Sequence, residues 1–483
     1  MERSKPKKTF HFHHRLPNFD GSKISALSDH FTPLPLPQLV HMVLSEIRHN
    51  RLFNIPGSLF FYPGKQDPFR IERYGTLLAT PLGVAAGPHT QLSQNIIAAW
   101  LCGARYIELK TIQTLDELKV SKPCIDMQDE GYNCEWSQEL KIRQSFREYL
   151  NAWILIHILH KEMRLEGPVG TLFNMSVGYN LDGILQDNVQ WFFNQMSDCS
   201  AALATARDEI RQIYPAIDSL EIPGTISNHV TLSTMHGCPP EEIDKIGLYL
   251  IRDKRLHTTI KLNPTLLGAD TLRNILNDKL GFETHVPDAA FDHDLKYHDA
   301  LKIISSLQQA STEEGLDFSI KLTNTLESIN HKNVFGKDEA MMYMSGRALH
   351  PISITLALKL QEDFKGELDL SFAGGADCFN IASILACGLK PVTYCSDLLK
   401  PGGYGRLWQS IDHLRNSFAS FGAADIESMI LCTAKDKRLN LREAALTNLR
   451  HYADRVTTLP AYHPNPLLVP AIKTRRPLGW FDC

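Results

Sequence analysis

Lysine residues interrupt three apolar, strand-like segments of this 483-residue chain. Lys110 ends the segment YIELK, Lys261 lies in IKLNP, and Lys321 lies in IKLTN. A lysine inside an apolar strand is costly unless an anionic group meets it. A structural Glu or Asp could satisfy any one of these lysines. Three lysines that converge on one site instead indicate a ligand with distributed negative charge.

Two other segments run from strand-favouring residues into small residues that can expose backbone N–H groups. They are SFAGG at 371–375 and TYCS at 393–396. In a (β/α)₈ barrel the loops after the seventh and eighth strands commonly hold a phosphate. Flavin mononucleotide (FMN) would answer both patterns, with its phosphate on these loops. Lys261 would then reach the N1/O2 edge of the ring, which becomes negative on reduction.

Cys238 is the candidate proton donor or acceptor, in the segment TMHGCPP at 234–240. The two prolines are placed to open a helix. A cysteine beside a helix N-terminus is expected to have a lowered pKa, and His236 could assist it. The alternative is a packed structural thiol, which we favour for Cys102, Cys199 and Cys387. Glycine and proline flanks are not typical of a packed core, so we predict a functional Cys238.

Eight short apolar runs bounded by turn residues are the candidate strands that position these groups. They span 77–85, 106–112, 171–177, 230–234, 258–262, 318–323, 368–373 and 391–395. Helical patterns lie between them at 91–101, 240–252, 352–360 and 380–387. The alternation predicts an α/β fold, a (β/α)₈ TIM barrel, with a doubly wound open sheet as the rival. The rival is disfavoured because no Gly-x-Gly-x-x-Gly turn follows a strand.

Three domain-level segments are expected. Residues 1–70 form an N-terminal helical extension, 71–420 the FMN-binding barrel, and 421–483 a helical C-terminal segment and linker. The intervals 113–170, 178–229 and 263–317 are too long for simple crossovers, so we expect extra helices or lids there.

Composition excludes several classes of protein. The net charge of −4 argues against a bulk nucleic-acid binder. No apolar run is long enough for a membrane helix or a signal peptide. The ten cysteines show no zinc or CxxC spacing, which favours reduced thiols in the cytoplasm. His11, His13 and His14 could bind a metal, but no expected element holds them, so we predict no metal site.

A series of motifs identifies a resemblance to a known family. In order over residues 81–403 they are PLGVAAGPHTQ, ELKT, FNMSVGYN, TLSTMHGCPP, IKLNPTLLG, KLTNT, MSGRALHP, FAGGAD and YCSDLLKPGG. With them the chain resembles the flavin-binding barrel of the dihydroorotate dehydrogenases and dihydropyrimidine dehydrogenase. It looks closest to the bacterial selenate reductase subunit family.

The resemblance implies roles for individual residues. Cys238 would move a proton to or from the substrate carbon, opposite hydride exchange with flavin N5, and Lys110 and Lys261 would be catalytic ammonium groups. FMN-contacting positions would be Ala86, Lys110, Thr111, Lys261, Gly346, Ala373, Gly374, Gly375, Cys395 and Ser396. Substrate-binding positions would be Asn180, Asn324 and Thr325.

The chain also departs from the family pattern. The pyrimidine enzymes have Asn-Leu-Ser-Cys-Pro at the catalytic loop, whereas this chain has STMHGCP and lacks that asparagine. The interval 113–170 has no counterpart in the small enzymes. Longer relatives continue into iron–sulfur and FAD/NAD(P)H modules. The resemblance therefore implies that an iron–sulfur cluster and FAD reach this barrel only through a partner subunit or further C-terminal modules, with Cys483 as an isolated cluster ligand.

These patterns together predict an FMN-dependent oxidoreductase that acts on CH–CH or similar groups of an unsaturated, nitrogenous small molecule. One alternative is a lyase in which Lys261 or Lys321 forms a Schiff base on a phosphate-binding barrel. The other is a non-catalytic barrel subunit of a larger iron–sulfur flavoprotein complex. An electron-transfer partner is expected, no nucleic-acid or membrane partner is, and a homodimer is a further expectation because related barrels often pair.

Overall fold

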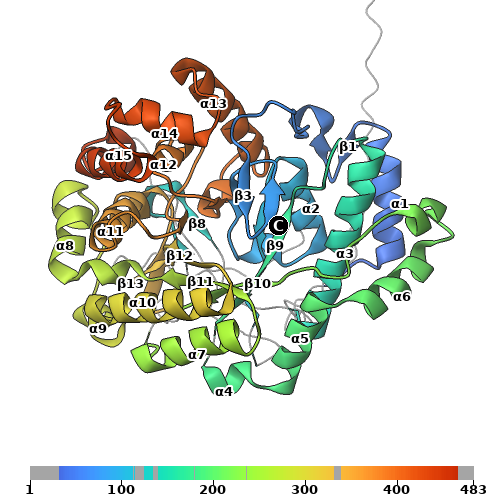
Figure 1. Cartoon of the computed structure of the whole chain (residues 1–483), viewed down its shortest axis with the longest axis horizontal. Helices are drawn as coiled ribbons and strands as arrows, with labels where there is room; N and C mark the ends of the chain where they lie inside the picture. The colour runs from blue at the N-terminus through green and yellow to red at the C-terminus, as the bar shows by residue number, and fades with distance from the viewer. Residues whose placement is uncertain are drawn as a thin grey trace, which may run out of the picture.

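A closed barrel of eight parallel strands forms the centre of the computed structural model (Figure 1). The structure describes residues 32–112, 114, 125–133, 140–178, 180–234, 237–330 and 339–465. In ring order the strands are β5 (Leu82–Val84), β6 (Tyr106–Glu108), β9 (Leu172–Val177), β10 (His229–Ser233), β11 (His257–Leu262), β12 (Phe318–Leu322), β15 (Leu370–Phe372) and β16 (Val392–Tyr394), which closes on β5. The predicted TIM barrel is therefore confirmed.

Each of the eight predicted strand segments overlaps one barrel strand, although the first prediction was too long. Residues 77–85 do not form a single strand, because the chain turns at Ala79–Pro81 between β4 (Thr76–Leu78) and β5. Proline has no N–H to donate to a strand ladder. In addition, the Thr80 hydroxyl donates to the Gly103 carbonyl at 2.6 Å instead of continuing a strand pairing.

A hairpin that the sequence patterns did not predict closes the amino-terminal end of the barrel. It consists of β3 (Ile71–Arg73) and β4, paired antiparallel. Arg73 is buried; its guanidinium pairs with Asp369 and donates to the Ser319 hydroxyl at 2.7 Å. The Tyr74 hydroxyl lies 2.8 Å from that of Thr259. These contacts join the hairpin to the amino ends of β11, β12 and β15, so ligands are expected at the opposite end.

Helices surround the barrel on its outer face, as parallel strands covered on both sides require. After successive barrel strands the chain forms α2 (Ser93–Leu101), α3 (Ile142–Glu162), α4 (Leu181–Ile184), α5 (Asp187–Ser197), α6 (Ser200–Ile210), α7 (Pro240–Arg252), α8 (Ala269–Arg273), α9 (Asp288–His293), α10 (Tyr297–Glu314), α11 (His350–Asp363), α12 (Ile381–Ala386) and α13 (Gly405–Phe421). The long intervals do carry extra helices, as expected: α4, α5 and α6 in one, and α8 and α9 in another.

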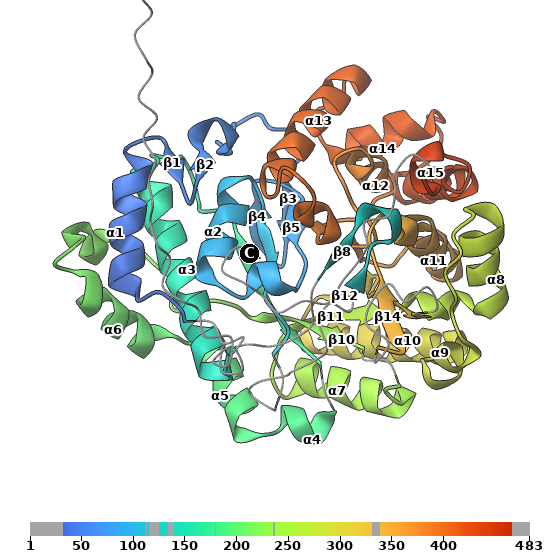
Figure 2. The same cartoon turned by 180° about the vertical axis from the view of Figure 1, so that it is seen from behind.

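A small four-stranded sheet lies at the carboxyl-terminal side of the barrel, and β8 and β14 are visible in Figure 2. Its strands, in spatial order, are β13 (Leu326–Ile329), β14 (Met341–Met344), β7 (Ile125–Asp126) and β8 (Tyr132–Asn133). The sheet joins the interval after β6 to the segment that follows β12. The Ser345 amide donates to the Asp126 carbonyl at 2.9 Å, which fixes the sheet beside the loop that carries Gly346.

Helices at both ends of the described chain pack on the barrel's helical layer. α1 (Leu36–Ile47) contacts α3 and α6, whereas α14 (Ile426–Ala434) and α15 (Leu441–Val456) contact α11 and α12. The division of the chain at residues 70 and 420 stays a prediction. In the part of the chain that the structure describes, no helix combines the length and apolar character that a membrane crossing requires.

Candidate functional site at the carboxyl ends of the strands

Strand register places two lysines next to each other inside the barrel. Lys261 of β11 pairs in register with Lys321 of β12. Residues directly opposite on adjacent parallel strands point to the same face of the sheet. Both side chains are buried, with Lys261 8% and Lys321 0% exposed. Two ammonium groups side by side in a buried layer repel each other, so a negative charge must lie nearby.

Glu108 supplies that negative charge from the opposite wall of the barrel. Its Oε2 pairs with the Lys321 ammonium and accepts the Ala86 amide at 3.2 Å. Its Oε1 lies 3.9 Å from Lys261 Nζ and has no hydrogen-bond partner among the described residues. Glu108 is fully buried. A structural carboxylate was the alternative explanation for each buried lysine, and Lys321 has such a partner in Glu108.

The pKa values of this pair reflect burial and mutual attraction. Burial would raise the pKa of Glu108, but Lys261 and Lys321 outweigh it and hold the pKa below its ordinary value. Burial lowers the pKa of Lys321 to about 8, even though the Glu108 carboxylate opposes the change. Lys321 is therefore an ammonium group that can exchange its proton close to neutral pH.

Lys110, at the end of β6, adds a third buried ammonium group near the same place, with an exposure of 6%. Its charge, second to burial, lowers the pKa of His89 to about 4. Burial raises the pKa of Cys395 to about 11, and the nearby Lys261 and Lys110 charges oppose this rise. Cys395 thus shares an environment with both predicted lysines. Lys110 thus adds a third buried lysine to the group of Lys261, Lys321 and Glu108.

The predicted phosphate loops are tightly packed against other parts of the chain. A Cβ on Gly374 would lie 2.1 Å from Ser353 Oγ, and one on Gly375 would lie 2.5 Å from the Gly346 carbonyl. Gly375 and Gly346 also have left-handed φ values of 63° and 82°. The protein's own packing therefore requires these glycines.

One expectation for these loops is wrong. The Gly374 amide donates to the Leu322 carbonyl at 3.2 Å, beside the Ala373 amide, which donates to the same oxygen at 2.6 Å. The Gly374 amide is consequently used within the barrel and is not available to a phosphate. Nearby, the hydroxyls of Ser345 and Ser396 lie 2.7 Å apart, so Ser396 remains at the rim of the site.

Charged residues that sequence reasoning missed surround these loops. Arg347, directly after Gly346, pairs with Asp129 and lies 3.4 Å from Glu130. Lys400 lies 2.6 Å from Glu130 and 3.3 Å from Asp397. Arg347 and Lys400 stand in the quoted motifs MSGRALHP and YCSDLLKPGG, so those motifs were the available signal.

The predicted substrate residues have defined partners in the structure. The Asn324 amide group donates to Asn263 Oδ1 at 2.8 Å and to the Thr234 and Lys261 carbonyls at 3.2 and 3.3 Å. Asn180 is exposed, and its side-chain oxygen caps α4 by accepting the Gly183 amide at 2.9 Å. Asn324 therefore braces the strand ends around Lys261, whereas Asn180 is held at a helix start. Thr325 and Thr111 are half-buried, and the Thr111 hydroxyl lies 2.8 Å from that of Ser176.

Cys238 lies immediately before α7, as predicted, but its thiol differs from expectation. Burial raises the pKa of Cys238 to about 11, and the Glu242 carboxylate adds to the rise. The expected lowering by the helix N-terminus is therefore wrong, because burial of the thiol outweighs it and Glu242 in the first turn of α7 adds negative charge. The Gly237 amide donates to Asp294 at 3.2 Å and fixes the approach to the thiol. His236 lies outside the described residues.

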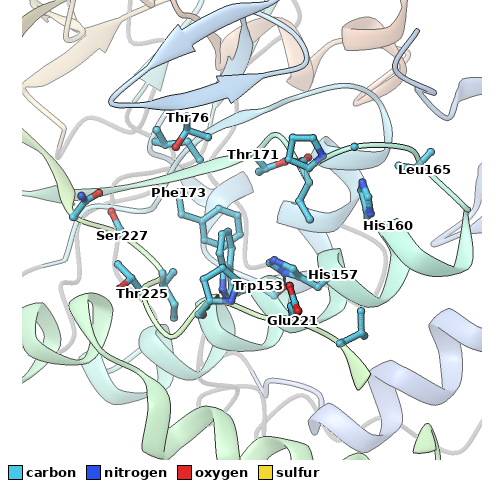
Figure 3. A pocket seen from close by; sticks show the side chains of 18 of the residues that line it. Thr76, Trp153, His157, His160, Leu165, Thr171, Phe173, Glu221, Thr225 and Ser227 are labelled. Carbon is cyan, nitrogen blue, oxygen red and sulfur yellow. Dashed lines mark hydrogen bonds between the residues drawn. The ribbon is translucent and has the colours of Figure 1, made fainter. Parts of the chain in front are cut away.

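A recess of about 840 Å³ lies at the opposite, amino-terminal end (Figure 3). Trp153, His157 and His160 of α3 face it, together with Phe173 and Glu221. Burial lowers the pKa values of both histidines. None of the three buried lysines lines this recess, so the candidate site is assigned to the carboxyl ends.

Among the described residues no group of His, Cys, Asp and Glu could hold a metal ion, and His11, His13, His14 and Cys483 lie outside that part of the chain.

Comparisons with known proteins agree with the architecture. The model of a family described as "Oxidoreductase YgfK, N-terminal TIM-barrel domain" matches residues 53–445. "Putative oxidoreductase YgfK" of Escherichia coli strain K12 is 42% identical over 415 residues, which cover 81% of this chain and 40% of that protein. The protein of the same name from E. coli O157:H7 gives the same values. The chain thus spans about two fifths of the length of these curated relatives.

Two crystal structures of DHODH from Eimeria tenella are also similar to the chain, each with 14% sequence identity and a TM-score of 0.48. The ligand-free structure covers 83% of this chain and 100% of its own, and the complex with ferulenol covers 85% and 98%. The family match extends over most of the chain, from the first short hairpin to α15. The chain therefore belongs to the family of the YgfK N-terminal TIM-barrel oxidoreductase domain.

Proposed function

We propose that this barrel binds FMN at the carboxyl ends of its strands and is the FMN-dependent oxidoreductase domain of a longer electron-transfer system. The observation that carries the proposal is the excess of one positive charge in the buried group of Lys261, Lys321 and Glu108, in which two lysines share one carboxylate. Such an excess is costly without an anion. Bound FMN supplies two-electron chemistry and an edge that becomes negative on reduction.

The residues of the site fit such a group. Lys261 is held by a carboxylate 3.9 Å away and not by a direct hydrogen bond to it, so its ammonium has donors for a ligand. Ala86, Thr111, Gly346, Ala373, Gly375, Cys395 and Ser396 stand around the same strand ends, where they would contact the ring and the phosphate. Arg347 and Lys400 lie beside the loops, where each is paired with carboxylates of the chain. Backbone amides at such loops favour an anionic phosphate.

Cys238 would act as the proton donor to a substrate carbon. With its pKa raised to about 11, the side chain is a thiol at neutral pH. Its S–H bond breaks, the proton goes to the carbon, and the sulfur is left as a thiolate that solvent must reprotonate. A thiol with a high pKa is mostly protonated at neutral pH, so it is available as an acid more than as a base. This favours reduction of an unsaturated substrate over its oxidation.

The substrate would be a small, unsaturated, nitrogenous molecule, with Asn324, Thr325 and Asn180 as its polar contacts. The curated relatives are about two and a half times the matched length. We therefore propose that iron–sulfur, FAD and NAD(P)H centres of a partner or of further modules deliver the electrons, in the cytoplasm. A selenate reductase role and a homodimer also belong to this proposal.

A binding experiment tests the proposal. Apo protein is titrated with FMN and with riboflavin, and flavin fluorescence is followed. FMN should bind at least tenfold more tightly than riboflavin, because the loops meet the phosphate. Lys261→Gln should weaken binding of FMN, whereas Lys302→Gln should not, since Lys302 is exposed and pairs only with Asp299 at 3.2 Å. Failure of the protein to bind FMN would remove the proposal.

The Schiff-base alternative makes a different prediction for the same lysines. Lys321 is fully buried and paired with Glu108, so a carbonyl substrate could reach only Lys261. Borohydride in the presence of a carbonyl compound should then add mass at Lys261. Under the flavin proposal no adduct forms.

A further inference from the structure

A charge pair spans the interior of the barrel beneath the candidate site. Glu108 lies on β6 and Lys321 on β12, and these strands are four steps apart in either direction around the ring of eight. The pair therefore crosses the barrel from wall to wall. Both residues are completely buried. A ligand at the carboxyl ends would rest on this layer.

Lys321 belongs to the same layer as Lys261, since the two are register neighbours. Lys321 also lies near Cys395, whose thiolate form would raise the pKa of the lysine. Its ammonium faces the Tyr106 ring with 5.7 Å between Nζ and the ring centroid, which closes the layer on the amino-terminal side. Its charge is thus shielded from below by protein and directed toward the carboxyl ends.

Glu108 divides its two oxygens between the lysines. Oε2 is saturated by Lys321 and the Ala86 amide, whereas Oε1 has no hydrogen-bond partner in the described part of the chain and faces Lys261 at 3.9 Å. The carboxylate consequently attracts both ammonium groups while contacting one. Without it, two like charges would face each other across adjacent strands.

We propose that Lys321 is a further ammonium group acting on the flavin beside Lys261, and that the Glu108 carboxylate between the two lysines offsets part of their charge. This inference rests on the proposed FMN site. Its consequence is that Lys261 and Lys321 both balance the negative charge that the flavin gains on reduction. Each of the two lysines should therefore make reduced FMN bind more tightly.

The direction of the expected effect follows from the charge that each substitution removes. Lys321→Gln keeps a donor for Glu108 but removes one positive charge. Glu108→Gln/Lys321→Gln removes one charge of each sign and restores the native balance. We expect Lys321→Gln to weaken reduced FMN relative to oxidised FMN by about tenfold, which is about 30 mV in the midpoint potential of a two-electron couple. The double variant should return to within about threefold of the native protein.

Two further measurements separate this inference from its alternatives. Urea unfolding of each apo protein reports whether Gln at these positions merely damages the fold. If Lys321 has only a structural role, Lys321→Gln should lower the free energy of unfolding and leave the midpoint potential unchanged. That result would overturn the inference, and so would a double variant whose midpoint potential does not return toward the native value. If no variant and no native protein binds FMN, the proposed function itself has failed. Lys302→Gln, which removes an exposed charge, should leave both the potential and the unfolding unchanged.

The native protein offers an independent check if Lys321→Gln does not fold. The titratable groups packed against Lys321 are Glu108, Lys261, Tyr106 and Cys395. Burial raises the pKa of Cys395 to about 11 and that of Tyr106 well above its ordinary value, and the pKa of Glu108 is low. If Lys321 senses the flavin with the tenfold coupling expected above, its pKa rises by about one unit on reduction, so reduction near pH 8–9 should take up about half a proton more than reduction below pH 6. Equal uptake across this range would contradict the inference.

Discussion

Glu108 and Lys321 form a buried ion pair, and we expect substitutions of these two residues to lower the stability of the protein by different amounts. We compare Glu108→Leu with Lys321→Met in the apo protein at pH 7. Both residues are fully buried, and removing one partner of such a pair leaves an uncompensated charge, which typically costs about 3–5 kcal/mol. Lys261 makes the difference between the two variants.

In Lys321→Met, Glu108 keeps Lys261 at 3.9 Å. At an effective dielectric constant of about 20, that attraction is about 4 kcal/mol, so the carboxylate remains partly compensated and we expect a loss of about 2–3 kcal/mol. In Glu108→Leu, Lys261 and Lys321 lose their shared counter-charge and repel across adjacent strands. We expect a loss of about 4–5 kcal/mol.

The double variant Glu108→Leu/Lys321→Met removes the pair and keeps a similar side-chain volume, and Lys261 then loses both the attraction of Glu108 and the opposing repulsion of Lys321. The double variant should unfold within about 1–2 kcal/mol of the native protein, far from the sum of the single losses. Urea unfolding followed by circular dichroism gives the comparison, with Lys302→Met as an exposed control expected within about 0.5 kcal/mol. The reasoning fails if Glu108→Leu is no worse than Lys321→Met, or if the double variant shows the full sum.

Other predictions concern Gly374, the β3–β4 hairpin, the Cys238 thiol and Lys321. Gly374→Ala should cost about 1–3 kcal/mol in urea unfolding, and Ser353→Ala should not restore stability, because the Ser353 Cβ itself would lie 2.5 Å from the new methyl group. Arg73→Met should cost about 2–3 kcal/mol in the same assay by releasing the hairpin; a loss below 0.5 kcal/mol would mean that the hairpin is not held there. Alkylation of Cys238 by iodoacetamide should rise about tenfold per pH unit from pH 8 to 10, with Cys238→Ser as control, and a plateau near pH 8 would contradict the raised pKa. The pKa of Lys321 is about 8 when folded and 10.5 ordinarily, so the unfolded chain binds more protons between these values; native stability should therefore rise with pH across this window relative to Lys321→Gln, and a parallel course would refute it.

Much of the barrel could be predicted from the sequence because parallel strands covered on both faces are apolar, short and regularly spaced. The helix at 240–252 was also predicted with the bounds that α7 has, since proline marks its start. The β3–β4 hairpin was missed because its key residue, Arg73, is charged. Its burial depends on Asp369 and Ser319, which are distant in sequence.

The site could be predicted only in part, for a related physical reason. Lysines in apolar strands are visible one at a time, but whether each has a counter-charge depends on the ring of strands. Glu108 stands two residues before Lys110, yet its side chain crosses the barrel to Lys321. The pKa of Cys238 was misjudged similarly. The helix N-terminus was visible in the prolines, but the effect of burial and of Glu242 needed the packed structure.

The location of the charges also decides which end of the barrel can do redox chemistry. At the amino end, Arg73 pairs with Asp369 and holds the hairpin, and burial lowers the pKa values of His157 and His160 in the recess. At the carboxyl end, Glu108 cannot neutralise the lysines around it. An enzyme that stores electrons on a bound ring needs a fixed positive charge that does not have to reorganise as the electrons arrive. Lys261 and Lys321 provide such charge at the carboxyl end, and the strands that carry them belong to the closed ring, so the fold and the proposed chemistry depend on the same layer.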